Sequence, residues 1–311
     1  MTEKEPLLSI CIPTYNREKY LKRLLDSVVC QKEFKDTDDV DIVVDDGPSS
    51  DNTESMVKEY IKKYWNKIKY YRNPVRIWMC PAFLEALDYW TWKYLRLFGS
   101  DNVMGEHALK TVLNAIKSTY PKTVMMMWCK NKNNFEMILN FNWFSDFSSY
   151  LWTHKRDALQ YEWWLITFCT YCCLENSYYK QWKAFLEKIW NVDNETLKYN
   201  YFNFNLIKYF GLFGVNSISF VESPELVILN SDDAESSRTI NFKILRDLNM
   251  LIDFINDNYV LTLNSKKVFF KIKLLWIIAL LVKPLKKVLH FLKLEKYYFK
   301  MWSKFRKTLN Q

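Results

Sequence analysis

The chain has 311 residues, of which 49% are hydrophobic and 17% aromatic, and this composition excludes a disordered protein. Its net charge is +9, but residues 265–311 contain twelve Lys, one Arg and one Glu (+12), so the other 264 residues carry −3. A mildly acidic body offers no basic groove for a phosphate backbone, and we therefore expect no nucleic-acid partner.

Apolar runs of strand length alternate with helical patterns over the first 130 residues. The predicted strands are residues 7–13, 40–45, 67–72, 93–98 and 123–128. The predicted helices between them are residues 17–31, 50–65, 81–90 and 106–116. This order predicts an α/β fold with a mostly parallel sheet and helices on both faces.

Local signals add detail to this scheme. Ser50 or Asp51 followed by Glu54 predicts a capping box at the head of the second helix. Further along, residues 130–134 predict a hairpin or loop, and residues 225–229 a strand. A helical pattern also covers residues 178–190, and a long amphipathic helix is expected over residues 235–263.

The last 46 residues have a different character, and we expect a helical C-terminal region over 235–311 with a basic amphipathic tail from about residue 266. The uncharged run 274–282 has nine residues, whereas a membrane-spanning helix needs about 20. Beyond Pro284, lysines recur every seven residues, at Lys286, Lys293, Lys300 and Lys307. Such a tail would bind an anionic membrane surface; the alternative is a helix that packs on the domain and exposes its lysines.

Cysteines and the N-terminus indicate the compartment. The first residues hold two glutamates and only a short apolar run, so we expect no secretory signal and a cytoplasmic protein. The seven cysteines mostly lie in apolar segments and the three histidines are scattered. We therefore expect reduced thiols rather than a zinc site at the Cys169, Cys172 and Cys173 cluster.

Polar side chains gather where the predicted strands end. In open sheets, ligands bind beyond the carboxyl ends of the strands, which are here residues 13–17, 45–53, 72–76 and 98–102. Neither glycine-rich phosphate motif is present, which argues against a dinucleotide enzyme and a P-loop ATPase. An aspartate here could bind a base, a ribose or a divalent cation, whereas a single Asp is more often a turn or helix-capping residue.

Four segments taken together resemble a known family. LLSICIPTYNREKYLKRLLDSVVCQ, VDIVVDDGPSSDNTESMVKEY, KIKYYRNP and YLRLFGSDNVMGEHAL are similar to the nucleotide-sugar-binding half of family 2 glycosyltransferases with the GT-A fold. The resemblance covers about residues 7–120, and FSSYLWTHKRDAL (147–159) is similar to bacterial O-antigen transferases of the abequosyltransferase type. It implies a nucleotide-sugar-binding half over 1–130 and an acceptor-binding half over 131–234.

The resemblance also implies roles for single residues. Those that it places at the nucleotide are Pro13, Tyr15, Arg17, Asp46, Asn73 and Ser100, with Asp46 at the base or ribose. Asp101 and Asn102 occupy the corner that would hold Mn²⁺ or Mg²⁺, but Asn102 stands where the family commonly has a second acid. Asp101 is a predicted catalytic residue. No family motif assigns the catalytic base; Glu162 is predicted for this role, with Glu175 as the alternative, because both fall at a plausible distance after the corner.

Two functions remain open at this point. The first is a hexosyl- or deoxyhexosyltransferase, inverting, that uses a nucleotide-sugar donor and a lipid-linked oligosaccharide acceptor in O-antigen-like polysaccharide synthesis. It would lie peripherally on the inner face of the cytoplasmic membrane. The second is a degenerate GT-A domain that binds nucleotide, glycan or a partner without turnover, and the neutral Asn102 motivates it.

Overall fold

The computed structural model describes residues 5–76, 79–89, 93–127, 137–143, 146, 150, 172–180, 183, 216–222 and 227–228. The chain divides into two units, and all the helices and strands named below lie in the first, residues 1–144 and 165–239. The domain boundaries inferred from the sequence remain predictions.

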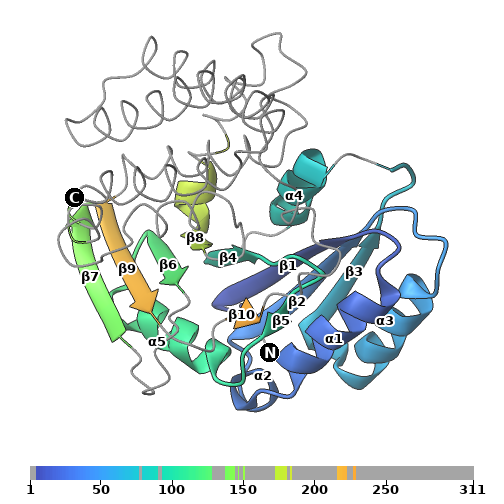
Figure 1. Ribbon diagram of the computed structural model, residues 1–311, viewed down its shortest axis with the longest axis horizontal. Coiled ribbons are helices and arrows are strands. Elements are labelled where there is room, and N and C mark those ends of the chain that lie inside the picture. Colours follow the sequence, from blue (N-terminus) through green and yellow to red (C-terminus); the bar gives the residue numbers. More distant parts are fainter. Residues whose placement is uncertain are drawn as a thin grey trace, which may run out of the picture. The chain divides into compact units, whose positions relative to one another are not determined.

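An eight-stranded sheet forms the centre of this unit, in the order β3-β2-β1-β4-β8-β6-β9-β7 (Figure 1). Its strands are β1 (Leu8–Thr14), β2 (Val40–Asp46), β3 (Ile68–Arg72), β4 (Tyr94–Leu97), β6 (Thr123–Met127), β7 (Met137–Trp143), β8 (Cys172–Glu175) and β9 (Asn216–Glu222). All except β8 and β7 run in the same direction. The prediction of a mostly parallel sheet is therefore confirmed, including its five N-terminal strands.

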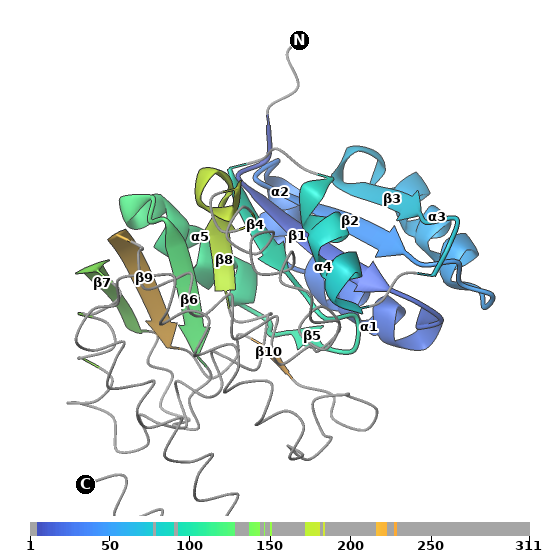
Figure 2. The same cartoon turned by 90° about the horizontal axis from the view of Figure 1, so that it is seen from above.

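Helices cover both faces of the sheet, as predicted. They are α1 (Glu18–Val29), α2 (Lys32–Asp36), α3 (Thr53–Lys63), α4 (Met79–Asp88) and α5 (Ala108–Thr119), with a 3-10 turn, η1, at Trp65–Lys67. Helix α4 lies on one face, and α1, α2, α3 and α5 lie on the other (Figures 1 and 2). Because both faces are covered, every residue of β1 and β2 is buried.

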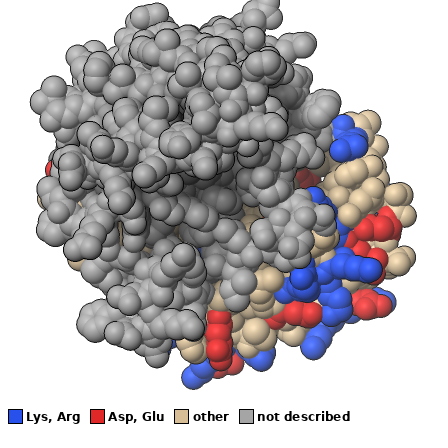
Figure 3. Space-filling view, in the orientation of Figure 1, with Lys and Arg blue, Asp and Glu red and all other residues tan. Residues whose placement is uncertain are grey.

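The helices bury the stripe that their sequence spacing predicts. Leu21, Leu24, Leu25 and Val28 of α1 recur at the spacing of one helical face, and each is fully buried. The opposite face is solvated: over α1 and α3, Lys and Arg alternate with Asp and Glu on the surface (Figure 3). One of these neighbouring pairs is Lys22 with Asp26.

Three local predictions need correction or refinement. No capping box forms at α3: Glu54 pairs with Lys58 and Arg72, while the carboxylate of Asp51 accepts hydrogen bonds from the backbone N–H groups of Glu18 and Thr53. The sequence spacing therefore correctly placed the acid Glu54 in the first turn of α3. It could not show that Glu54 pairs with Arg72, because Arg72 lies in a neighbouring strand.

Residues 130–134 lie outside the described residues, but the strands on either side do not pair as a hairpin. Strand β9 lies between β6 and β7, parallel to the first and antiparallel to the second. Of the predicted strand 225–229 the structure describes residues 227 and 228, which form β10 (Val227–Ile228) and pair with β5 (Val103–Met104). Long-range pairing of this kind leaves no signal in a local sequence window.

The C-terminal region predicted over 235–311, with its tail, lies outside the described residues. Within the part of the chain that the structure describes, no helix has the length and hydropathy needed to cross a membrane. Cys11, Cys172 and Cys173 are buried and form no disulfide with a described residue, in agreement with the prediction of reduced thiols; Cys30 forms none either and is exposed.

Candidate functional site

Three neighbouring parallel strands end at the same level of the sheet. In the register of β1 and β2, Pro13 lies beside Asp45 and Thr14 beside Asp46; in that of β2 and β3, Asp46 lies beside Arg72. The loops that follow these strands therefore leave the sheet together. We call this side of the sheet, formed by the carboxyl ends of its parallel strands, the C-terminal edge. The candidate nucleotide- and cation-binding residues were predicted from the sequence to lie there.

Tyr15 begins the loop after β1, and its half-buried ring packs directly on Gly47. A Cβ atom on Gly47 would lie 3.0 Å from Cδ2 of Tyr15, so a larger residue there would push the ring away. The Gly47 N–H also donates to the Thr14 carbonyl at 2.9 Å. The guanidinium of Arg76 lies 4.5 Å from the centre of the Tyr15 ring, which gives a cation–π contact.

Asp46 is fully buried, and both of its carboxylate oxygens have partners. Oδ1 accepts a hydrogen bond from Ser49 Oγ at 2.5 Å, and Oδ2 accepts one from the Tyr70 hydroxyl at 2.7 Å. Burial raises the pKa of Asp46, although these two hydrogen bonds and the nearby Arg72 oppose the change. A base or ribose that binds Asp46 must therefore replace or share one of these partners.

Asp45, which begins the segment 45–53 but had no role assigned from the sequence, points to the opposite face of the sheet because side chains alternate along a strand. It is 2% exposed; Oδ1 accepts a hydrogen bond from Asn73 Nδ2 at 2.9 Å, and Oδ2 has no partner among the described residues. Burial raises the pKa of Asp45 to about 7, with further contributions from the charges of Glu85 and Asp46 and an opposing one from Asn73.

Asn73 links this buried carboxyl to helix α4. Its Nδ2 donates to Asp45, and its Oδ1 lies 3.2 Å from the Tyr89 hydroxyl, which also lies 3.0 Å from Glu85 Oε1. The Tyr89 ring stacks on Tyr71 with centroids 4.2 Å apart. The side chain of Asn73 is thus engaged within the protein, and its predicted contact with the nucleotide stays a prediction.

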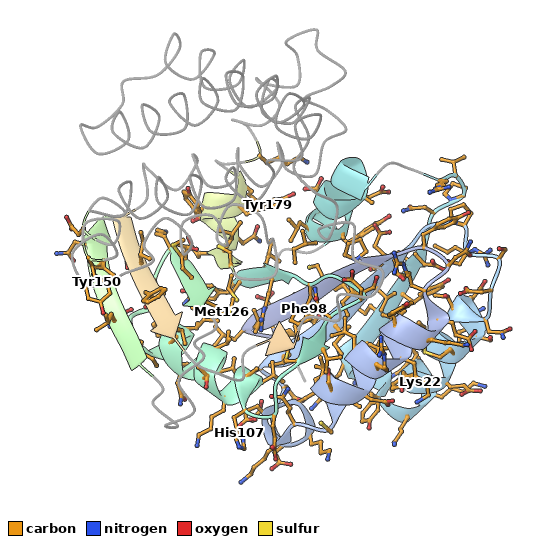
Figure 4. The ribbon with its side chains drawn as sticks, viewed as in Figure 1. Lys22, Phe98, His107, Met126, Tyr150 and Tyr179 are labelled. Atoms are coloured by element: carbon orange, nitrogen blue, oxygen red, sulfur yellow. The ribbon has the colours of Figure 1, made fainter. Side chains whose placement is uncertain are left out.

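The fourth strand ends in a tight turn. The backbone N–H of Phe98, labelled in Figure 4, bonds to the Cys11 carbonyl of β1 at 2.8 Å, and Asn102 N–H bonds to the Gly99 carbonyl at 3.1 Å. A Cβ on Gly99 would lie 2.8 Å from Asn102 Nδ2 and 2.9 Å from Asp101 Oδ1. The side chains of Asp101 and Asn102 therefore converge over Gly99, which has room for them because it lacks a side chain.

This corner has the donor set for a hard cation. It offers one carboxylate and one amide, and no cluster of three His, Cys, Asp or Glu is found among the described residues. Mg²⁺ is commonly held by one or two carboxylates together with substrate phosphates. The residue types therefore fit a cation shared with a diphosphate. Asp101 would supply its carboxylate, and Asn102 its amide oxygen once the amide group turns, because Nδ2 is the atom that now lies beside Gly99. Ser100, between Gly99 and Asp101, is half-buried.

The other predicted residues have different positions. Pro13 is buried within β1, and Arg17 directly precedes α1 with its guanidinium 5.2 Å from the centre of the Tyr20 ring. Glu162 lies outside the described residues. Glu175 pairs with Tyr94 at the start of β4, the opposite edge from Asp101, so it is not brought to the corner.

Glu175 is also engaged in an ion pair. Its carboxylate lies 2.7 Å from Lys122 Nζ and accepts a hydrogen bond from Ser177. Burial alone would raise the pKa of Glu175, but these partners reverse the effect and lower it. A carboxylate with a lowered pKa, placed at the far edge, is a poor base for chemistry at Asp101.

Comparison with known proteins decides the family. Residues 9–182, more than half of the chain, match the family described as Glycosyl transferase family 2. The chain belongs to this family. The family assignment drawn from the four sequence segments is confirmed, while the roles of the individual residues stay predictions.

Two relatives illustrate the extent of the similarity. The chain is 37% identical over 114 residues to abequosyltransferase RfbV of Salmonella typhimurium, which covers 37% of this chain and 32% of the relative. It is 40% identical over 68 residues to the GalNAc(5)-diNAcBac-PP-undecaprenol beta-1,3-glucosyltransferase of Campylobacter jejuni. This match covers 22% of this chain and 20% of the relative. The matched segments thus span a third or less of these relatives.

A solved structure extends the comparison to the fold. Mannosyltransferase PcManGT from Pyrobaculum calidifontis, in complex with GDP-Man and Mn²⁺, superposes with a TM-score of 0.52 at 16% identity. The match covers 87% of this chain and 70% of that protein. At this identity the likeness concerns the fold alone, and it confirms the GT-A architecture expected for a family 2 member.

Proposed function

We propose that the protein transfers a hexosyl or deoxyhexosyl group from a nucleotide-sugar donor to a lipid-linked oligosaccharide acceptor, in the synthesis of a surface polysaccharide of the O-antigen type. The observation that carries this proposal is the convergence of Asp101 and Asn102 over Gly99, at the carboxyl end of a strand in a family 2 fold. The undecaprenol-linked acceptor of the Campylobacter jejuni glucosyltransferase supports the class of acceptor.

Each part of the edge has a chemical task in this proposal. Tyr15 offers an aromatic face to the base, and Asp46 offers hydrogen-bond acceptors for base or ribose N–H and O–H groups. A divalent cation at Asp101 and Asn102 would neutralise charge on the departing nucleoside diphosphate. For inversion, a base must take the proton of the acceptor hydroxyl from the opposite face, and Glu162 is our candidate.

The acceptor class also suggests a place in the cell. We propose that the protein acts at the inner face of the cytoplasmic membrane, with the basic tail from about residue 266 held by anionic lipids. Liposome cosedimentation of the full chain and of a chain truncated at residue 265 tests this part separately. Equal binding of the two chains to phosphatidylglycerol vesicles would contradict it.

Donor turnover tests the proposed function directly. We expect the purified chain to release nucleoside diphosphate from at least one of a panel of nucleotide sugars in the presence of Mn²⁺ or Mg²⁺. Asp101→Ala should reduce this release about 100-fold or more, since it removes the carboxylate of the corner. Asp38→Ala is the matched control, because Asp38 is an exposed acid just before β2, at the opposite edge of the sheet.

A second function is favoured by one specific observation, the neutral side chain of Asn102 in the corner. A domain with a weakened cation site could bind nucleotide without turnover. Binding of a nucleoside diphosphate by a chain that turns over no nucleotide sugar would favour this alternative over the transferase.

A further inference from the structure

Ser49 lies in the loop after β2, within the segment 45–53 that the sequence singled out, but without a role assigned to it. The residue is 4% exposed. Its hydroxyl donates a hydrogen bond to Asp46 Oδ1 at 2.5 Å and accepts one from the backbone N–H of Asn16 at 2.8 Å. A serine hydroxyl has one hydrogen and two lone pairs, so both bonds form at once.

The backbone around Ser49 adds two further links. The Ser49 carbonyl accepts a hydrogen bond from Arg72 Nη2 at 2.9 Å, and the next N–H, of Ser50, donates to Asn16 Oδ1 at 2.8 Å. Asn16 follows β1, Asp46 ends β2, and Arg72 ends β3. Hydrogen bonds of Ser49 and of the next backbone N–H therefore connect the ends of three neighbouring strands.

The link to Asn16 matters because the backbone there is unusual. Asn16 has φ 51°, in the left-handed region that few residues other than glycine adopt and that Asn tolerates best. This conformation turns the chain directly after Tyr15. A hydrogen bond to the Asn16 N–H therefore stabilises the turn that places the Tyr15 ring on Gly47.

We propose that Ser49 is a positioning residue for recognition of the donor's nucleobase. Its hydroxyl bonds directly to the carboxylate of Asp46 and, through Asn16, determines the position of the Tyr15 ring. The carboxylate and the ring are thereby held at a constant separation and angle from each other. A planar base is distinguished from others by hydrogen bonds made at a defined angle to its stacking surface. The inference rests on the proposed function, since it assumes that this edge binds a nucleotide.

Binding of nucleoside diphosphates to the full chain tests the inference. Dissociation constants for UDP, GDP, ADP, CDP and dTDP are measured by calorimetry with Mn²⁺, and the ratio between the best and second-best nucleotide is the readout. We expect Ser49→Ala to weaken binding of the best nucleotide at least tenfold and to reduce this ratio at least fivefold. Ser49→Thr, which keeps the hydroxyl, should preserve the ratio.

Ser55→Ala is the matched control, because Ser55 is exposed and its hydroxyl donates locally, to the carbonyl of Asn52 just before its own helix, at 3.0 Å. It should change neither the affinity nor the ratio. Thermal unfolding of each variant establishes that it is folded. If Ser49→Ala does not fold, Ser49→Cys, with similar volume and a weaker donor, takes its place and should lower the ratio in the same direction.

Three results would overturn the inference in distinguishable ways. An unchanged ratio in folded Ser49→Ala would refute the positioning role even if every nucleotide bound more weakly, since a purely structural defect weakens all of them alike. A reduced ratio in Ser49→Thr would show that the hydroxyl is not the operative group. Absence of binding by the parent protein to all five nucleotides would refute the proposed function itself.

Discussion

Replacing Asp45 with asparagine should make the protein more stable at alkaline pH but not at acidic pH. The pKa of Asp45 is about 7 in the folded protein and 3.8 as its ordinary value. Because the folded value is the higher one, the folded state favours the protonated carboxyl, and stability falls as the pH rises from 3.8 through 7. The amide introduced by Asp45→Asn cannot ionise, so the variant avoids this loss.

The size of the effect follows from the two pKa values. Each pKa unit corresponds to 1.36 kcal/mol, so the interval from 3.8 to about 7 amounts to about 4 kcal/mol when the pH lies well above both values. Between pH 5 and pH 9, about 3 kcal/mol of this difference should develop. The geometry permits the change, since the amide oxygen of the new side chain can still accept the hydrogen bond from Asn73 Nδ2.

Urea unfolding followed by circular dichroism at pH 5, 7 and 9 measures this difference. Asp38→Asn is the control, because Asp38 is an exposed acid and its replacement should have nearly the same effect at every pH. A stability difference between Asp45→Asn and the parent that stays constant from pH 5 to pH 9 would refute the reasoning. A stability difference that became smaller from pH 5 to pH 9 would also refute the reasoning, because it would mean that the folded protein favours the charged form of Asp45.

Two further substitutions test the corner formed by Asp101 and Asn102, and a third tests the buried carboxylate of Asp46. Gly99→Ala places a Cβ 2.8 Å from Asn102 Nδ2 and 2.9 Å from Asp101 Oδ1. The Mn²⁺ affinity, measured by calorimetry, should therefore fall about tenfold or more. An unchanged affinity would exclude a cation there. Asn102→Asp adds a carboxylate and should raise Mn²⁺ affinity; a lower value would contradict the assigned donors. Tyr70→Phe removes a partner of buried Asp46 and should lower the unfolding free energy at pH 7 by about 1–3 kcal/mol, which urea titration checks.

The five N-terminal strands of the sheet were predictable from local pattern, whereas β7, β8 and β9 were not predicted. Strand β1 and helix α1 follow each other as an apolar run and an amphipathic spacing, and both were found within one or two residues of their predicted bounds. The short helix α2 was not predicted, because five residues are too few to show a periodicity. The position of β9 between β6 and β7 depends on pairing across about 75 to 95 residues, which a local window does not contain.

The candidate site was predictable in its location more than in its contacts. Tyr15, Asp46 and Asp101 follow apolar runs in the sequence, and the structure places each at the end of a strand. The sequence could not show that Asp46 is already bonded by Ser49 and Tyr70, since those partners come from a loop and a neighbouring strand.

The adjacent acids at the end of β2 show where local information ends. By itself the sequence determined that an apolar strand, predicted over residues 40–45, ends in two adjacent acids, Asp45 and Asp46. Only the tertiary structure decided their chemistry. It placed Ser49 and Tyr70 against Asp46 and left Asp45 beneath α4, near Glu85, where burial raises its pKa to about 7. The physical reason is that burial and hydrogen bonding depend on which elements pack around each face, and these elements come from distant parts of the chain.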